Sequence, residues 1–299
     1  PPMRAPGMMA PMTADAPVLY LNGDYVPAAS AAVPVEDRGF LFGDACYEVT
    51  AVVGGVCIAL DRHLARLQRG LDELRIDYDA AQLAPIHSEL IERNGLAAAP
   101  KASVYVHITR GVAPRAHAFP VGVTPTVLVR AQPIPGPSAA VLESGTRAIT
   151  HDDERWGRVD IKTTGLLANV LAQQAAIDAG VDDVILLRDG VVTEGSRTNV
   201  LAVLDGALVT APSDHRILGG VTRSIVIELA AAEGIEVDER PWSVGELRRA
   251  DEVLMTSTTS GVRPITEVDG ALVGSGKRGA VTRRLQDAYA AFVADQVSG

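Results

Sequence analysis

The chain has 299 residues, of which 47% are hydrophobic and 21% charged, a composition typical of a globular protein with a substantial core. Its formal net charge of −10 argues against nucleic acid or an anionic membrane surface as the main partner. Cys46 and Cys57 have no metal-ligand spacing, so we expect reduced thiols and a cytoplasmic protein. Residues 1–16 are rich in Pro, Ala and Met, lack a continuous apolar run, and are expected to be a disordered leader.

Residues 17–132 are expected to form an N-terminal α/β domain. Apolar residues alternate on both sides of Asn22-Gly23 and again around Gly54-Gly55, a pattern that indicates two β-hairpins. Leucines spaced three and four apart over 60–74 predict an amphipathic helix with Asp61 near its N-cap. The runs ASVYVHITRG and PTVLVRAQP, which flank the loop TRGVAPRAHAFP, predict two further strands.

The segment PIPGPS, residues 133–138, holds three prolines and one glycine and is the expected interdomain linker. Residues 139–299 are then a second domain. Within it we expect a strand in TRAITHDDE, a helix over 163–179 that uses Leu167, Val170 and Leu171, and three strand runs between residues 183 and 212. A helix near 221–229, a strand in EVLMTST and a terminal helix follow. Because strands and helices do not alternate strictly, two α/β-type domains are favoured over one doubly wound sheet.

Two titratable residues are candidates for chemistry. Lys162 follows Ile161 and precedes a helix-forming run, and a partly buried lysine loses proton affinity and becomes a nucleophile suited to a Schiff base. From this stretch alone, the simpler interpretation is a strand-end lysine that reaches water. Glu194 ends a β-branched run, where a carboxylate can hold a cationic ring nitrogen; the alternative is a turn glutamate in solvent.

Other features suit a phosphate. Gly219-Gly220 precede a helix that begins near Val221 and Thr222, and N–H groups at a helix start form an anion cradle. The run TSTTSG, residues 256–261, adds hydroxyl groups, and Arg66 on the leucine helix adds a cation. Each has an ordinary alternative: a glycine loop, an exposed Ser/Thr loop and a solvated arginine. Together, the lysine, the acid and the phosphate donors meet the separate needs of pyridoxal 5′-phosphate (PLP).

The sequence resembles a known family in seven ordered stretches: EDRGFLFGDACYEV, HLARL, TRGVAPRAHAFP, DERWGRVDIK, VTEGSRTNV, LGGVTR and TSTTS. From about Leu19 to the C-terminal helix it is similar to the fold-type IV PLP-dependent aminotransferases (class IV), and within them to the D-amino-acid transaminases of bacteria. The resemblance implies an α/β (α+β) fold with a smaller N-terminal domain and a larger C-terminal domain that contains a barrel-like sheet. It also implies a homodimer with active sites near the interface.

The resemblance assigns roles to individual residues. Lys162 would form the internal aldimine with PLP and shuttle a proton between the substrate Cα and the cofactor, and Glu194 would hold the pyridine nitrogen. Tyr47 would lie near the substrate carboxylate. The remaining expected cofactor contacts, with the phosphate or with the face of the ring, are Arg66, Leu218, Val221, Thr222, Ser257 and Thr258.

Arg115 and His117 are two residues apart, so an extended loop places them on one face. The resemblance implies that they trap the substrate α-carboxylate of the neighbouring subunit, for which a guanidinium fork is suited. By itself the loop is better interpreted as an exposed turn bounded by prolines. If the pair does hold the carboxylate, it determines which hand of amino acid presents its Cα hydrogen to Lys162.

The chain departs from the D-amino-acid pattern at two places. Arg197-Thr198 stand where small hydroxyl residues are expected, and Arg197 can modify the cofactor surroundings, bind a substrate side-chain carboxylate or point into solvent. Thr50-Ala51 stand where a longer polar side chain is expected at the second position. The predicted activity is amino transfer from a D-alanine-like amino acid to 2-oxoglutarate. The alternatives are a branched-chain L-amino-acid aminotransferase, an aminodeoxychorismate lyase and a non-catalytic PLP-binding sensor.

Overall fold

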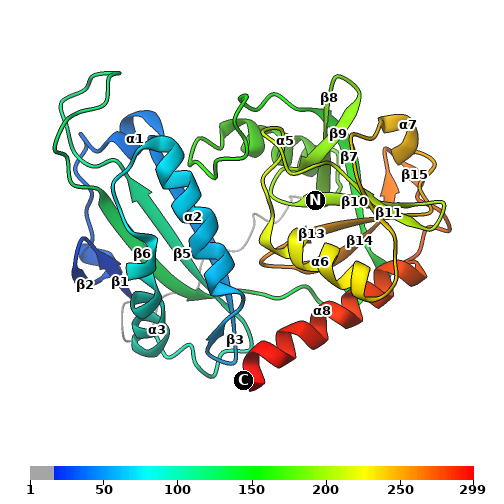
Figure 1. The fold of residues 1–299 in the computed structure, drawn as a ribbon, viewed down its shortest axis with the longest axis horizontal. Helices are drawn as coiled ribbons and strands as arrows, with labels where there is room; N and C mark the ends of the chain where they lie inside the picture. The colour runs from blue at the N-terminus through cyan, green and yellow to red at the C-terminus, as the bar shows by residue number, and fades with distance from the viewer. Residues whose placement is uncertain (1–16) are drawn as a thin grey trace, which may run out of the picture.

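The computed structural model describes residues 17–299, which form two β-sheets with their helices on either side of a central gap (Figure 1). The predicted leader, residues 1–16, lies outside the described part. The elements of the first half are β1 (Val18–Leu21), β2 (Asp24–Pro27), α1 (Arg38–Phe42), β3 (Ala45–Val53), β4 (Val56–Cys57), α2 (Leu60–Leu74), α3 (Leu83–Arg93), β5 (Ala102–Thr109) and β6 (Thr126–Pro133), with short 3₁₀ turns at Ala28–Ser30 and Ala80–Gln82.

The first sheet has six antiparallel strands in the order β2-β1-β6-β5-β3-β4. Both predicted hairpins are confirmed. Asn22 and Gly23 have φ of 53° and 106°, and Gly54 and Gly55 have φ of 56° and 81°. Positive φ at both central residues is what a type I′ turn requires, and its twist matches that of the strands.

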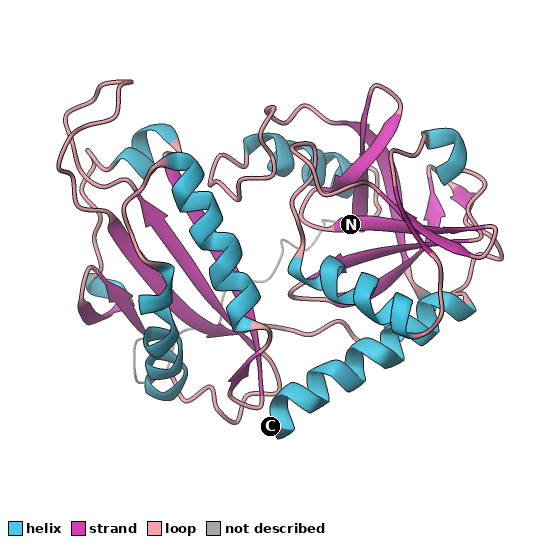
Figure 2. Ribbon diagram, in the orientation of Figure 1, coloured by secondary structure: helices cyan, strands magenta, loops and turns pink. Residues whose placement is uncertain are grey.

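Helices α2 and α3 cover one face of this sheet (Figure 2). The predicted leucine helix is confirmed, although its N-cap is Ala59 and Asp61 lies in its first turn. Its Leu67 and Leu71 pack with Cys46 of β3 in the core, together with α3, which the sequence analysis did not predict. On the other face of the sheet, Tyr47, Tyr105 and Leu128 stay partly exposed. The cavity described below opens beside Tyr47.

The second half contains the larger sheet. Its elements are α4 (Ala139–Ser144), β7 (Thr146–Asp152), α5 (Leu167–Asp178), β8 (Asp183–Arg188), β9 (Val191–Gly195), β10 (Asn199–Leu204), β11 (Ala207–Thr210), α6 (Val221–Ala232), β12 (Val237–Glu239), α7 (Val244–Leu247), β13 (Glu252–Ser257), β14 (Gly261–Val268), β15 (Ala271–Leu272) and α8 (Ala280–Ser298). Eight strands follow the order β12-β11-β10-β13-β14-β7-β8-β9, and β15 pairs with β14. The sheet curls into a half-barrel, and the two-domain α/β fold class expected from the sequence is confirmed.

Three details differ from the sequence-based expectations. The helix expected over 163–179 begins only at Leu167, because Thr163 forms a β-bridge with Cys46 instead. The three strand runs expected between residues 183 and 212 are four strands, since only residues 196–198 separate β9 from β10. The apolar residues expected to form the buried face of α5 are exposed: Leu167 is 72% exposed and Val170 59%. That helix is anchored through Ala172 and Ala176.

Apolar packing helps to join the halves. Ile161, in the loop after β7, is buried in the hydrophobic core of the first half. The last turns of α8 cross to the first half, where Phe292 and Val297 pack against Ile58 beside β4 (Figure 1). No helix in residues 17–299 is both long and apolar enough to cross a membrane.

We predict that Leu71→Ala lowers the free energy of unfolding by about 2–5 kcal/mol, because a fully buried leucine leaves a cavity when it is truncated. Leu272→Ala, at a side chain that is 66% exposed, should change it by less than about 0.5 kcal/mol. Guanidinium unfolding followed by circular dichroism measures both. Equal effects of the two substitutions would contradict the assignment of the core.

Candidate active site

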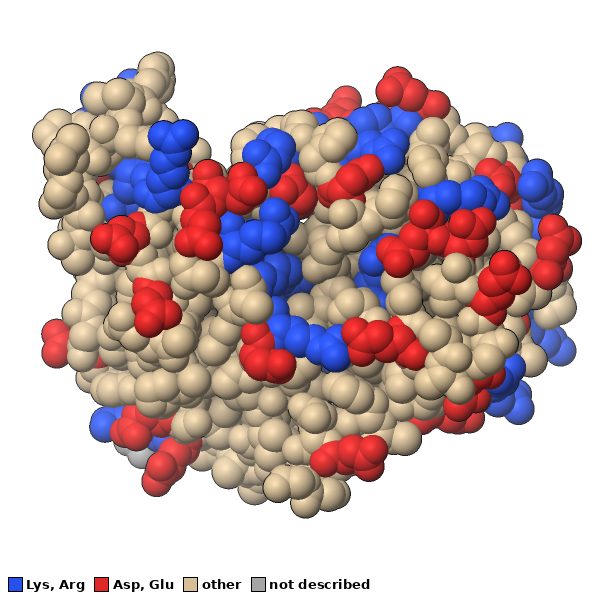
Figure 3. Space-filling model, viewed as in Figure 1, with Lys and Arg blue, Asp and Glu red and all other residues tan. Residues whose placement is uncertain are grey.

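A cavity of about 670 Å³ lies between the two halves. In Figure 3, Lys and Arg side chains gather around the hollow there, although the protein as a whole is acidic. Nine of the predicted site residues line this cavity: Tyr47, Arg66, Lys162, Glu194, Leu218, Val221, Thr222, Ser257 and Thr258. They come from β3, α2, the loop before α5, β9, the start of α6 and the end of β13. Sequence-distant residues therefore meet at one place.

Lys162 is held at the junction of the halves. The backbone N–H of Tyr47 donates to the carbonyl oxygen of Lys162 at 3.0 Å, beside the Cys46–Thr163 bridge. The Lys162 ammonium lies 4.2 Å from the centre of the Tyr47 ring. Backbone and side chain thus both tie the lysine to β3. Its amine faces the cavity next to an aromatic ring, a position from which it can act as a nucleophile or a base.

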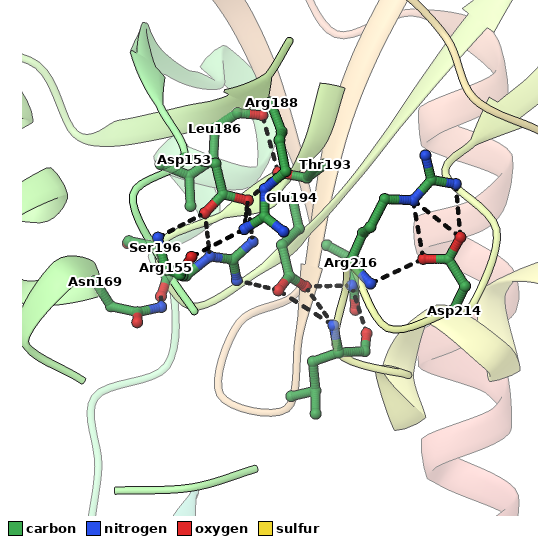
Figure 4. Close-up of polar contacts among 12 residues, drawn as sticks. Asp153, Arg155, Asn169, Leu186, Arg188, Thr193, Glu194, Ser196, Asp214 and Arg216 are labelled. Carbon is green, nitrogen blue, oxygen red and sulfur yellow. Dashed lines mark hydrogen bonds and ion pairs between the residues drawn. The ribbon is translucent and has the colours of Figure 1, made fainter. Parts of the chain in front are cut away.

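Glu194 is a buried carboxylate surrounded by three donor groups (Figure 4). It is ion-paired with Arg155, accepts from the side-chain amide of Asn199 at 2.9 Å, and accepts from the backbone N–H of Leu218 at 3.1 and 3.2 Å. Burial raises the pKa of Glu194, and the Arg155 charge opposes that effect. A carboxylate offers about four lone-pair sites, so Glu194 retains capacity for a cationic ring nitrogen from the cavity.

Arg155 and Asn199 were not singled out from the sequence. Arg155 is itself held by Asp153, with contacts of 2.8 and 2.9 Å, and Asp153 also accepts from Thr193. The available signal was the alternation of charges in DERWGR, because a buried glutamate in this region requires a buried cation. Nothing in the local spacing indicated which arginine would meet Glu194.

Arg66 is oriented by a second buried acid. Its Nε and Nη2 donate to the two carboxylate oxygens of Glu48 at 2.9 and 2.7 Å, and its Nη1 donates to the carbonyl of Gly219 at 2.9 Å. His63 contacts the same carboxylate at 3.1 Å. Although burial acts in the opposite direction, the Arg66 charge and the His63 hydrogen bond hold the pKa of Glu48 well below its usual range. A guanidinium has five N–H groups, so Arg66 still has donors for an anion.

The start of α6 has the features of a phosphate site. Its first N–H groups have no intrahelical acceptor, and its N-cap, Gly220, has no side chain to cap them. A Cβ on Gly220 would lie 1.9 Å from the side-chain oxygen of Asn199, so the close approach requires glycine. Across the cavity, the buried hydroxyl of Thr256 lacks a hydrogen-bond partner among the described residues. With Thr222 and Thr258 nearby in the lining, the donors present fit a phosphate group.

Arg115 and His117 do not line this cavity; both side chains are exposed. Their loop is nevertheless fixed, because Arg38 donates to the carbonyl of Ala116 at 2.6 Å and the Arg110 guanidinium stacks 3.6 Å from the Phe119 ring. The loop is therefore a defined projection from the first half.

The comparisons with known proteins agree with this geometry. The family "Amino-transferase class IV" matches residues 45–268. A D-alanine aminotransferase of Bacillus licheniformis is 40% identical over 90% of this chain and 95% of its own length, and one of Staphylococcus haemolyticus is 36% identical over 94% and 99%. The chain belongs to the class IV aminotransferases.

Solved structures give the same result. A branched-chain amino acid aminotransferase of Escherichia coli superposes with a TM-score of 0.86, 28% identity and coverage of 93% of this chain and 94% of that one. A T.th. branched-chain amino acid aminotransferase with pyridoxamine 5′-phosphate has a TM-score of 0.85, 25% identity and 95% coverage of each chain. The protein is accordingly a PLP-dependent aminotransferase that acts on amino acids and 2-oxo acids.

We predict that Glu48→Gln lowers the free energy of unfolding by about 3–5 kcal/mol at pH 7, because it leaves buried Arg66 without its counter-charge. Since the pKa of Glu48 is lower in the folded protein than in the unfolded chain, its charge stabilises the fold above the unfolded pKa of about 4.3. The difference between wild type and variant should therefore shrink as pH falls below about 4. Denaturation midpoints at several pH values measure it.

The matched control is Glu228→Gln, which removes the partner of Arg62 one turn earlier on α2. That pair is exposed, so its loss should change the free energy of unfolding by no more than about 1 kcal/mol. A Glu48 variant as stable as this control would show that the buried pair does not stabilise the fold.

Proposed function

We propose that this aminotransferase is specific for D-amino acids and moves the amino group of a D-alanine-like donor to 2-oxoglutarate. The observation that carries the proposal is the 36–40% identity with D-alanine aminotransferases over nine-tenths of the chain, together with the fixed Arg115–His117 loop. The branched-chain aminotransferases with similar folds are 25–28% identical. A shared fold supports the chemistry common to the family, and the site determines the substrate.

Each proposed role follows from a contact in the cavity. PLP, when bound, supplies the electron sink that stabilises negative charge at the substrate Cα. Lys162 is proposed to carry the cofactor and to accept the Cα proton at Nζ. Glu194, ion-paired with Arg155, would hold the ring nitrogen, and Leu218 would pack on the ring face. Arg66, Val221, Thr222, Ser257 and Thr258 would hold the phosphate.

Handedness requires a fixed carboxylate receptor. We propose that Tyr47 together with Arg115 and His117 holds the substrate α-carboxylate on one side of Lys162, so that the Cα hydrogen of the D-enantiomer points to Nζ. A charge-assisted hydrogen bond contributes about 1.5–3 kcal/mol net, and a bidentate arginine adds direction. The Lys162 ammonium lies 4.2 Å from the centre of the Tyr47 ring, so a carboxylate held beside Tyr47 would lie next to Nζ.

Because Arg115 and His117 lie outside the cavity of their own chain, we propose that a second copy receives them in a homodimer. Exposed apolar side chains support an interface: Phe40 is 76% exposed and Val121 99%, and on α5 Leu167 is 72% exposed. Such residues in a fixed loop and on a helix face are typical of surfaces covered in an assembly. The two free cysteines agree with the cytoplasmic location that we also propose.

The purified holoenzyme should convert D-alanine and 2-oxoglutarate to pyruvate and glutamate. We expect kcat/KM for D-alanine to be at least about 100-fold above that for L-alanine, because the Cα hydrogen of the L-enantiomer points away from Nζ and cannot be transferred to it. A panel of paired D- and L-amino acids, with release of pyruvate or the matching 2-oxo acid measured, tests this. Turnover of L-leucine or L-valine in preference to D-alanine would establish the branched-chain alternative. Release of pyruvate from aminodeoxychorismate would indicate the lyase. A change in the PLP absorption spectrum when a D-amino acid is added, with no product formed, would indicate a sensor.

Mixed dimers test the composite site. Arg115→Ala and Lys162→Ala should each abolish most D-alanine turnover. If Arg115 serves the partner's cavity, refolding the two variants together forms one intact site in each heterodimer and restores about a quarter of wild-type activity. An arginine that acts within its own chain predicts no restoration. The control mixes Lys162→Ala with Lys162→Ala, which contains no intact site in either case.

A further inference from the structure

The basic side chains that line the cavity are not equivalent. Among the described residues there are four, Arg66, Arg155, Lys162 and Arg197. Arg66 is paired with Glu48, and Arg155 with Glu194 and Asp153. Lys162 is the proposed base. In residues 17–299, Arg197 is the cavity-lining arginine that forms no ion pair and no hydrogen bond through its side chain.

The backbone that carries Arg197 is tightly held. The N–H of Gly195 donates to the carbonyl of Thr198 at 2.7 Å and closes the turn between β9 and β10. Ser196 is fixed to α5 on both sides, since Asn169 donates to its carbonyl at 2.7 Å and its hydroxyl donates to Gln173 at 2.8 Å. Ser196 and Thr198 are buried, whereas the Arg197 side chain between them is exposed. A rigid turn thus presents a free guanidinium at the wall of the cavity.

Neighbouring acids do not neutralise this charge. Asp183 is close enough for the Arg197 charge to lower its pKa, but that carboxylate is already ion-paired with Arg263 at 2.6 Å, and burial raises its pKa overall. Glu154 is an exposed acid in the cavity lining that makes no ion pair with Arg197. A guanidinium with all its donors available is suited to bidentate binding of a carboxylate.

We propose that Arg197 binds the side-chain carboxylate of dicarboxylic substrates, D-glutamate and 2-oxoglutarate, and so determines preference for them. This rests on the proposed D-amino-acid transaminase function. Tyr47 lies in the first half of the protein and Arg197 in the second, so the two reach the cavity from different halves. A five-carbon substrate whose α-carboxylate is held on the Tyr47 side has its second carboxylate available to Arg197. D-alanine has no group that reaches it.

The test compares substrates in the holoenzyme of Arg197→Gln. We expect kcat/KM for D-glutamate to fall about 10- to 100-fold, the effect of losing one charge-assisted hydrogen bond, mainly through KM. The value for D-alanine should change less than about threefold. Arg197→Lys should retain part of the preference. Arg249→Gln, at an exposed arginine outside the cavity, is the matched control and should change neither substrate.

Binding gives a readout independent of turnover. By calorimetry on the holoenzyme, glutarate should bind the wild type more tightly than butyrate, and Arg197→Gln should remove that difference. Equal losses for D-alanine and D-glutamate, or no loss for either, would overturn the role of Arg197, as would equal binding of both probes to the wild type. If the wild type turned over no D-amino acid, the proposed function would fail, and the glutarate comparison would still decide whether Arg197 receives a second carboxylate.

Discussion

The site depends on one short antiparallel contact between the two halves, the bridge of Cys46 with Thr163 and the hydrogen bond from the Tyr47 N–H to the Lys162 carbonyl. It fixes the loop before α5 onto β3, and Ile161 secures it by entering the core of the first half. Because of this contact, the lysine of one half faces the tyrosine and arginine of the other. The cavity is the space that remains around it.

The second constraint is charge. Two carboxylates at the cavity wall, Glu48 and Glu194, are buried, and each is paired with an arginine that is itself held in place. Removing one partner of such a pair leaves an uncompensated charge, so each pair fixes its own geometry. Within an acidic protein, these pairs hold Arg66 and Arg155 at the cavity wall, where Arg197 has no ion-pair partner among residues 17–299.

Predictions from the local sequence were confirmed where the structure depends only on residues that are neighbours along the chain. Asn22-Gly23 predicts its hairpin because the turn type is set by two residues, and the leucine spacing predicts α2 because one helix face repeats every three or four residues. They failed at residues 163–166, where a bridge to β3 replaces the first helical turn. They also missed the break between β9 and β10, where a tight turn over residues 196–198 is closed by the hydrogen bond from the Gly195 N–H to the Thr198 carbonyl.

The sequence by itself determined the family, the fold class and the candidate site residues. Ordered motifs such as DERWGRVDIK and VTEGSRTNV identify them without coordinates. Only the tertiary structure determined which acidic side chain forms an ion pair with which basic side chain. It paired Glu194 with Arg155 and Arg66 with Glu48, left Arg197 without an ion-pair partner in the part of the chain that the structure describes, and placed Arg115 outside its own cavity. Ion pairing and exposure depend on side chains far apart in sequence, and spacing along the chain contains no record of those distances.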